Sequence, residues 1–155
     1  MADEERGPSV RAVVLATDRS GRVLMVRQPG GAFAGAWLLP GGTVRAHERI
    51  EAGARREVRE ETGLELAELR LFALYEVMSV PAGRYHIVLH LFRAETLLAE
   101  PAPPRDATVA WRPPAGMRLH PAMRRQLRDA RVIDDADADI DAALAAAGIS
   151  MERLL

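Results

Sequence analysis

The sequence lacks cysteine and lysine and has no excess of charge of either sign. Without cysteine there is no disulfide framework and no thiolate metal site. All 21 basic residues are arginine, a side chain that also binds phosphate in a bidentate manner. The formal net charge of -1 gives no basic field of the kind that attracts nucleic acid or a membrane surface, so neither partner is expected.

Long apolar runs are also missing. No stretch reaches the length of a transmembrane helix, and the acidic start, Met1 to Glu5, has no apolar signal-peptide core. A cytoplasmic location is therefore expected. With 155 residues, 48% of them apolar, the chain is long enough for a single domain with a substantial core.

Hydrophobic patterning predicts strands on both sides of one central helix and a second helix late in the chain, which indicates an α/β fold. A turn at 18–21 predicts a hairpin between the first two strands, and Pro40-Gly41-Gly42 predicts a break in regular structure. Gly63 is suited to a left-handed helix cap. The predicted strands are 10–17, 23–26, 69–78, 85–92 and 107–111, and the predicted helices are 47–61 and 121–132.

The last segment, 134–155, is rich first in aspartate and then in alanine, and it predicts a short helical extension that ends near Gly148. An EF-hand calcium loop that starts at Asp135 is a disfavoured alternative, because it would place Ile140 where glycine is needed and Ala146 where glutamate is needed. The extension is a candidate contact surface for a homodimer.

One motif dominates the sequence. Gly42 to Leu64 reads G-x5-E-x7-R-E-V-x-E-E-x-G-L, a pattern whose chance of arising from this composition is about one in a million or rarer. On a helix, Glu57, Glu60 and Glu61 fall within an arc of roughly 100°. Three neighbouring carboxylates repel one another unless a cation lies between them, and Mg2+ prefers oxygen ligands. A solvent-facing acidic patch is the simpler alternative.

The motif resembles the Nudix box at every defined position. The resemblance extends through Trp37 to Gly42 before it and Ala110 to Pro113 after it, and it covers about residues 8–131. It implies a Nudix fold, a mixed β-sheet sandwiched between helices, in which the box forms a loop-helix-loop.

The resemblance also implies roles for the residues of the box. Glu57, Glu60 and Glu61, joined by the Gly42 carbonyl, are expected to bind Mg2+, with Mn2+ as a substitute. Arg56 is expected to orient a ligand carboxylate by a charged hydrogen bond. Glu48 is expected to assist the site indirectly, although its position in the first helical turn is also explained by the helix dipole.

The expected reaction is hydrolysis of a diphosphate linkage by attack of water on phosphorus. The expected substrate is a small nucleotide, either a nucleoside triphosphate, oxidised ones included, or a nucleoside diphosphate linked to another group, as in ADP-ribose. A nucleotide-sensing domain without catalysis is the alternative. The general base is left open between Asp106, on a loop before the last predicted strand, and the carboxylates Glu95, Glu100, Glu60 and Glu61.

Three residues outside the box are candidates for contact with the substrate. Arg27 could reach a phosphate, Trp37 could stack on a base, and His86 shares one strand face with His90. Arg27 and Trp37 each have a simpler interpretation, as a surface arginine and a core aromatic residue. The pair of histidines could instead bind a transition metal, although the candidate site is rich in oxygen ligands. Phe33 and Tyr85 are further candidates for contact with a base.

Overall fold

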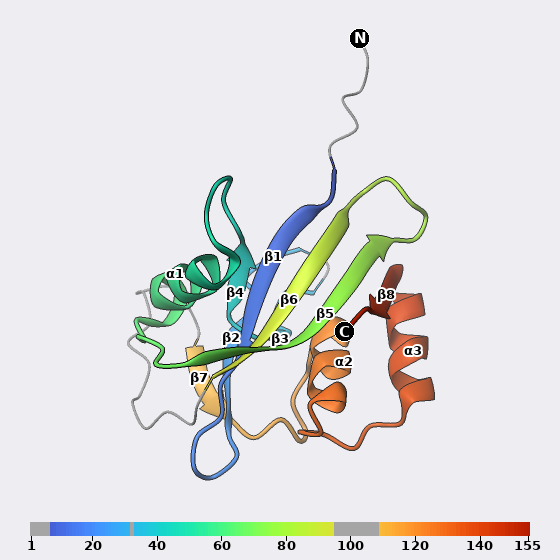
Figure 1. Cartoon of the computed structure of the whole chain (residues 1–155). Coiled ribbons are helices and arrows are strands. Elements are labelled where there is room, and N and C mark those ends of the chain that lie inside the picture. The colour runs from blue at the N-terminus through green and yellow to red at the C-terminus, as the bar shows by residue number, and fades with distance from the viewer. Residues whose placement is uncertain (1–6, 32, 95–108) are drawn as a thin grey trace.

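The computed structural model describes residues 7–31, 33–94 and 109–155. The described residues form two sheets and three helices, arranged as Figure 1 shows. The elements along the chain are β1 (Ser9–Leu15), β2 (Val23–Arg27), β3 (Trp37–Leu38), β4 (Gly41–Thr43), α1 (Ile50–Thr62), β5 (Leu69–Ser79), β6 (His86–Ala94), β7 (Val109–Arg112), α2 (Pro121–Asp129), α3 (Asp137–Ala146) and β8 (Ile149–Arg153).

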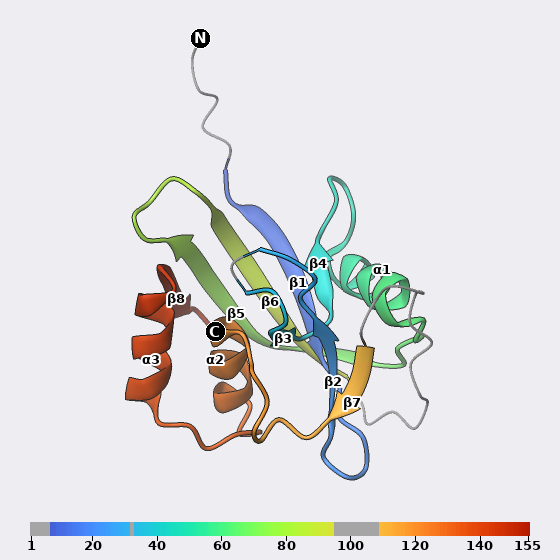
Figure 2. The same cartoon turned by 180° about the vertical axis from the view of Figure 1, so that it is seen from behind.

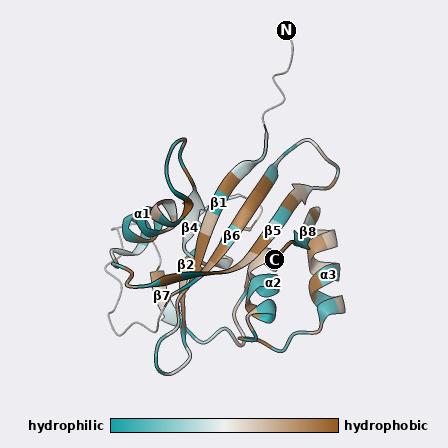
Figure 3. Ribbon diagram, viewed as in Figure 1, coloured by the Kyte–Doolittle hydropathy of each residue, from teal (hydrophilic) through white to brown (hydrophobic). Residues whose placement is uncertain are grey.

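The larger sheet is mixed. Its five strands lie in the order β4-β1-β6-β5-β8, and β1 runs parallel to β6 while the other neighbours are antiparallel. The smaller sheet has the order β3-β2-β7 and lies behind the larger one in the view of Figure 1, as the reverse view in Figure 2 shows. Apolar residues are concentrated on the central strands (Figure 3).

Alternating side chains of the larger sheet point to helices on opposite faces. In β6, Leu89 and Leu91 belong to the core cluster that contains Met123 and Leu127 of α2. Phe92 belongs to a second cluster, which contains Ala54 and Val58 of α1. Helices therefore cover both faces of a mixed sheet, which confirms the expected fold class.

The expected hairpin between the first two strands is wrong in part. The chain does turn back, and Thr17 forms an isolated antiparallel bridge with Val23. However, β1 and β2 belong to different sheets. Because β1 is already paired with β4 on one side and with β6 on the other, it has no free edge for β2.

The expected break at Pro40-Gly41-Gly42 is also wrong, because Gly41–Thr43 forms β4 and pairs with β1. A Cβ atom at Gly41 would come within 2.2 Å of the Ala12 carbonyl oxygen. Glycine here permits a close approach of two strands rather than ending a strand.

The boundaries of α1 follow from its local contacts. His47 has a positive φ of 63°, so the helix begins at Ile50 and not at His47 as predicted. Gly63 adopts the predicted left-handed cap, with φ 74°, and its N–H donates to the Arg59 carbonyl. The second predicted helix is present but ends at Asp129.

The C-terminal segment contains the predicted helix and one strand that was not predicted. α3 is followed by Gly148 and then by β8, which pairs with β5 at the edge of the larger sheet. Ile140, Leu144 and Ile149 are buried in the same core cluster as α2. Within the described residues, the helices are all too short or too polar to cross a membrane.

Candidate active site

The glutamates of the motif lie on α1, beside the strand that Gly41 and Gly42 form. α1 packs against β1 and β4, so the glutamates lie next to that edge of the larger sheet. The Glu57 carboxyl group lies directly over Gly42: a Cβ atom at Gly42 would be only 2.5 to 2.8 Å from the carboxyl atoms. A glycine at this position is therefore needed for Glu57 to reach the strand.

Arg56 organises the acidic side chains around one guanidinium group. Its Nε and Nη2 atoms donate to the two carboxyl oxygens of Glu48, at 2.7 and 3.0 Å. Its Nη1 atom donates to Glu57 at 3.0 Å and to Glu60 at 3.3 Å. Nη2 also donates to the Thr43 carbonyl at 3.1 Å, which ties the helix to the loop before it. One cation thus holds three carboxylates of the box.

The ion pair with Arg56 holds the Glu48 carboxyl group in place. The hydrogen bonds from Arg56, and then that from the Arg45 backbone N–H, lower the pKa of Glu48 to about 2. The pairing with Arg56 therefore favours the ionised form of Glu48. Its position stabilises the turn before α1 and the orientation of Arg56 together.

Glu61 has a different environment from the other glutamates. Its carboxyl group accepts a hydrogen bond from the Gly41 N–H at 3.1 Å. Burial raises the pKa of Glu61 to about 7, although this hydrogen bond opposes the rise, and the charges of Glu57 and Glu60 add to it. The Arg11 charge acts in the opposite direction. The site therefore concentrates negative charge that its own arginines balance only in part.

The donor set fits a hard cation in its chemistry. The three side chains offer carboxylate oxygens only, and Gly42 leaves space that the Glu57 carboxyl fills. Among the described residues, no three acidic or histidine side chains already converge closely enough to surround an ion. Glu57 and Glu60 are instead turned toward Arg56. A bound cation would replace part of that pairing.

The candidate substrate residues lie in two places. Trp37 is 8% exposed and belongs to the core, with the Arg112 guanidinium 6.0 Å from its ring centroid. Arg27 is exposed at the end of β2, opposite Trp37 in the strand register. The structure thus places these two residues side by side.

His86 lies elsewhere, on β6, and its Nε2 atom is 2.7 Å from a carboxyl oxygen of Glu76 on β5. His90, on the same strand, has a buried Nδ1 atom with no hydrogen-bond partner among the described residues. Asp106, Glu95 and Glu100, the general-base candidates outside the box, lie outside the described residues.

Sequence reasoning missed two arginines near these groups. Arg11 faces the site only because β1 pairs with β4, where it lies opposite Thr43. Arg118 reaches the loop before β3, where its Nη1 atom donates to the Ala34 carbonyl at 3.1 Å. Neither contact has a local sequence signal, because each joins segments that are distant along the chain.

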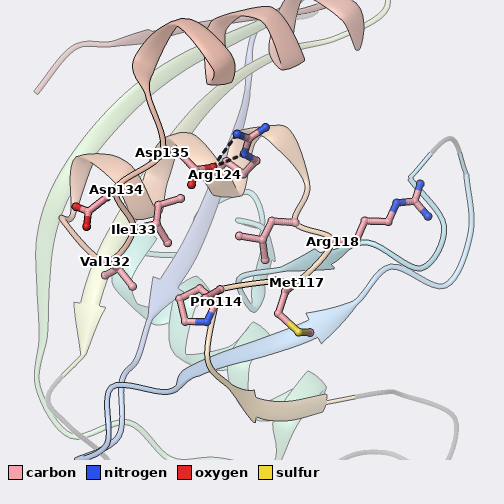
Figure 4. Close-up of a pocket in the computed structure, with 11 residues that line it drawn as sticks. Pro114, Met117, Arg118, Arg124, Val132, Ile133, Asp134 and Asp135 are labelled. Carbon is pink, nitrogen blue, oxygen red and sulfur yellow. Dashed lines mark hydrogen bonds and ion pairs between the residues drawn. The ribbon is translucent and has the colours of Figure 1, made fainter.

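A cavity of about 580 Å3 lies away from the glutamates, between the loop that follows β7 and the segment that follows α2 (Figure 4). Its wall combines apolar residues with charged ones; the apolar side includes Met117, Val132 and Ile133, and the charged residues are Arg118, Arg124, Asp134 and Asp135. The ion pair of Arg124 with Asp135 closes one side, at 2.7 Å. None of the box glutamates lines this cavity.

Comparisons with known proteins agree with this geometry. Residues 6–135 match the profile of the NUDIX domain. The oxidized purine nucleoside triphosphate hydrolase of Danio rerio is 35% identical over 92 residues, 59% of this chain and 58% of that protein. The m7GpppN-mRNA hydrolase NUDT17 of Xenopus laevis is 33% identical over 96 residues, 56% of this chain and 32% of that protein. The chain thus matches less than two thirds of the length of these curated relatives.

Solved structures show the same fold. The MutT NUDIX hydrolase from Burkholderia pseudomallei superposes with a TM-score of 0.69 at 27% identity, covering 80% of this chain and 98% of that one. The NUDIX domain of Shewanella oneidensis NrtR, solved with ADP ribose, gives a TM-score of 0.67 at 20% identity over 84% and 92% of the two chains. Because the family profile covers most of the sequence and the box occupies α1 and its flanking loops, this chain belongs to the NUDIX family.

Proposed function

We propose that this protein is a divalent-cation-dependent hydrolase that cleaves a diphosphate linkage in a nucleoside diphosphate derivative. The observation that carries the proposal is the placement of Glu57, Glu60 and Glu61 beside Gly42, with Arg56 bridging two of them. The names of the curated relatives, which describe hydrolysis of oxidised purine nucleoside triphosphates and of capped mRNA, support phosphate anhydride substrates.

In this proposal, Glu57, Glu60, Glu61 and the Gly42 carbonyl hold Mg2+ or Mn2+. When bound, the cation supplies charge stabilisation on the phosphate oxygens and activates water. Arg56 keeps Glu57 and Glu60 in place through its Nη1 atom, and Glu48 holds Arg56 by a bidentate pair. The family box and the all-oxygen donor set support these roles.

The general base and the residues that bind the substrate are proposed from their positions in the chain and in the structure. The proton of the attacking water passes to a carboxylate, for which Asp106, Glu60 and Glu61 are the candidates. Arg27 is exposed and is proposed to contact a substrate phosphate. The burial of Trp37 favours a role in the core, and the pairing of His86 with Glu76 favours a role in the sheet.

Turnover of a nucleotide panel with Mg2+ tests the proposal. The panel contains nucleoside triphosphates, their oxidised forms and ADP-ribose, and released phosphate or pyrophosphate is measured after a coupling phosphatase. Glu60→Gln and Glu61→Gln are expected to lower kcat at least about a hundredfold, since each removes a charged ligand.

The matched control is Glu65→Gln, because within residues 7–31, 33–94 and 109–155 Glu65 forms its ion pair only with Arg59, at the surface. It should keep wild-type turnover. If Glu60→Gln and Glu61→Gln also kept it, the assignment of the metal site would be wrong. Ligand-dependent stabilisation of the wild type without any turnover would instead favour a nucleotide-sensing domain.

A further inference from the structure

Two arginines from distant segments converge beside the loop that precedes β3. A Cβ atom built at Gly35 would lie 3.7 Å from Nη2 of Arg27 and 3.8 Å from Nη1 of Arg118. The two guanidinium groups therefore lie close to one common point. Arg27 comes from the end of β2, and Arg118 from the loop between β7 and α2.

The backbone fixes this convergence. Arg27 lies opposite Trp37 in the register of β2 and β3. The Arg118 carbonyl accepts a hydrogen bond from the Trp37 N–H at 2.9 Å, and Leu119 forms a parallel bridge with Trp37. Both arginines are thus anchored on the same residue of β3, so their spacing does not depend on flexible side chains alone.

The loop between them is also closed by its own hydrogen bonds. The Gln28 N–H donates to the Ala36 carbonyl and the Gly35 N–H donates to the Gln28 carbonyl, both at 2.8 Å. Gly35 has a positive φ of 82°. A side chain at this position would be strained and would also occupy the point at which the arginines meet.

The positive charge at this point is not neutralised by the described part of the chain. Arg118 donates to the neutral carbonyl of Ala34. No carboxylate among residues 7–31, 33–94 and 109–155 pairs with Arg27 or Arg118. The arginines of α1 and α2, by contrast, form ion pairs with nearby carboxylates. Figure 4 shows Arg118 directed away from Asp134 and Asp135, toward this loop. Two like charges held together without a counter-ion form a site for an anion.

We infer that Arg27 and Arg118 together form a phosphate-binding clamp that takes a phosphate group of the substrate. A phosphate that accepts a hydrogen bond of about 2.9 Å from each guanidinium group would bridge the two. Gly35, where the two arginines meet, precedes Gly42 by seven residues, so at most about 25 Å of backbone separates the clamp from the candidate metal site. We expect one nucleotide to engage both sites. This inference rests on the proposed function for the identity of the ligand, but not for the binding of an anion.

Calorimetric binding of inorganic pyrophosphate in the presence of EDTA tests the clamp without catalysis. We expect Arg118→Gln and Arg27→Gln each to weaken binding about tenfold or more, because each removes charged hydrogen bonds. Arg84→Gln is the matched control: it removes the same charge from the turn between β5 and β6, and it should bind as the wild type does. Wild-type affinity in both clamp variants would overturn the inference.

A second measurement identifies the source of the phosphate. With the nucleotide that gives turnover, Arg118→Gln should raise KM about tenfold or more. Weakened pyrophosphate binding with an unchanged KM would overturn the assignment to the substrate and would indicate a site for a free inorganic anion. Glu60→Gln should abolish turnover but retain pyrophosphate binding in EDTA, so failure of the clamp and failure of the proposed hydrolase activity give different results. Arg27→Gln keeps the test valid if Arg118→Gln does not fold.

Discussion

At the scale of single residues, Arg56 connects more of the candidate site than any one glutamate does. It hydrogen-bonds to Glu48, Glu57 and Glu60 and to the Thr43 carbonyl, and it is only 16% exposed. A lysine could neutralise charge here but could not reach four acceptors in a fixed plane. The geometry of the carboxylates therefore depends on the guanidinium group and not on charge alone.

Replacement of Arg56 by glutamine is the residue-scale prediction. Without the guanidinium group, Glu57 and Glu60 lose their shared donor, so we expect kcat to fall about 10- to 100-fold and the Mg2+ concentration for half-maximal activity to rise. Activity measured against Mg2+ concentration checks this. Arg59→Gln lies on the same helix, and in the described part of the chain Arg59 forms its ion pair with exposed Glu65, so this variant should leave both quantities unchanged. An unaltered Mg2+ dependence in Arg56→Gln would show that Arg56 does not position the ligands.

The sequence was most informative about which single residues are candidates for the site. The spacing of the motif and its resemblance to the Nudix box led to the selection of Gly42, Glu57, Glu60 and Glu61, which lie on one helix and the strand beside it. Arg11 and Arg118 could not be selected in this way, since their positions depend on strand pairing and on a loop contact. Gly41 was read as a breaker, whereas the proximity of the Ala12 carbonyl explains it.

At the scale of elements, α2 begins with an unusual cap. The His120 Nδ1 atom accepts a hydrogen bond from the Ala122 N–H at 3.1 Å, and the ring packs against Phe33 with centroids 4.3 Å apart. Burial lowers the pKa of His120 below its usual value of 6.5. The neutral ring is the form that caps the helix, because a protonated Nδ1 atom cannot accept a hydrogen bond.

This cap predicts a dependence of stability on pH. When the pH falls below 6.5, the unfolded chain binds a proton at His120 that the folded chain binds only at lower pH. The contribution of His120 to the free energy of unfolding should therefore decrease as the pH falls from 7.5 through 6.5, whereas Glu61, whose pKa the fold raises to about 7, contributes in the opposite direction. His120→Asn keeps a capping acceptor but does not titrate, so it should lack only the loss due to His120 over this range. Chemical denaturation of both proteins at pH 7.5 and 5.5 measures the difference, and parallel curves would contradict the assignment.

Most helices and strands could be predicted from local sequence patterns, but the pairing of the strands into sheets could not. Ile50, Ala54 and Val58 recur every four residues, a spacing that predicts a helix over this segment, and in α1 the last two are fully buried. β8 was missed because it is only five residues long and its partner, β5, lies about seventy residues earlier. The predicted hairpin between β1 and β2 was wrong for a related reason. β1 pairs with β4 and β6 instead of β2, and this pairing depends on the arrangement of all the strands in the larger sheet.

At the scale of the whole molecule, the C-terminal segment beyond the matched NUDIX region is part of the core. The family match ends at residue 135, yet Ile140 of α3 is fully buried among residues of α2 and the larger sheet. Arg125 of α2 also pairs with Asp137 and Asp141 of α3. The segment therefore contributes to the stability of the whole fold.

Truncation of one buried side chain tests this contribution. Ile140→Ala should lower the free energy of unfolding by about 2 to 5 kcal/mol, because it removes buried apolar atoms and leaves a cavity. Ala142→Ser, at an exposed position of α3, should change it by less than about 0.5 kcal/mol. Equal stability of the two variants in a denaturant titration would mean that α3 is not part of the folded core.

The central claim is that the carboxylates of α1, together with Gly42, hold a divalent cation. Crystals soaked in Mn2+ test it most directly, because the anomalous signal locates the ion independently of activity. We predict an anomalous peak between Glu57, Glu60 and Glu61, within about 2.5 Å of a carboxylate oxygen, with Glu57 or Glu60 turned from Arg56 toward the ion. The absence of a peak at saturating Mn2+, or a peak elsewhere with these side chains still turned to Arg56, would contradict the account.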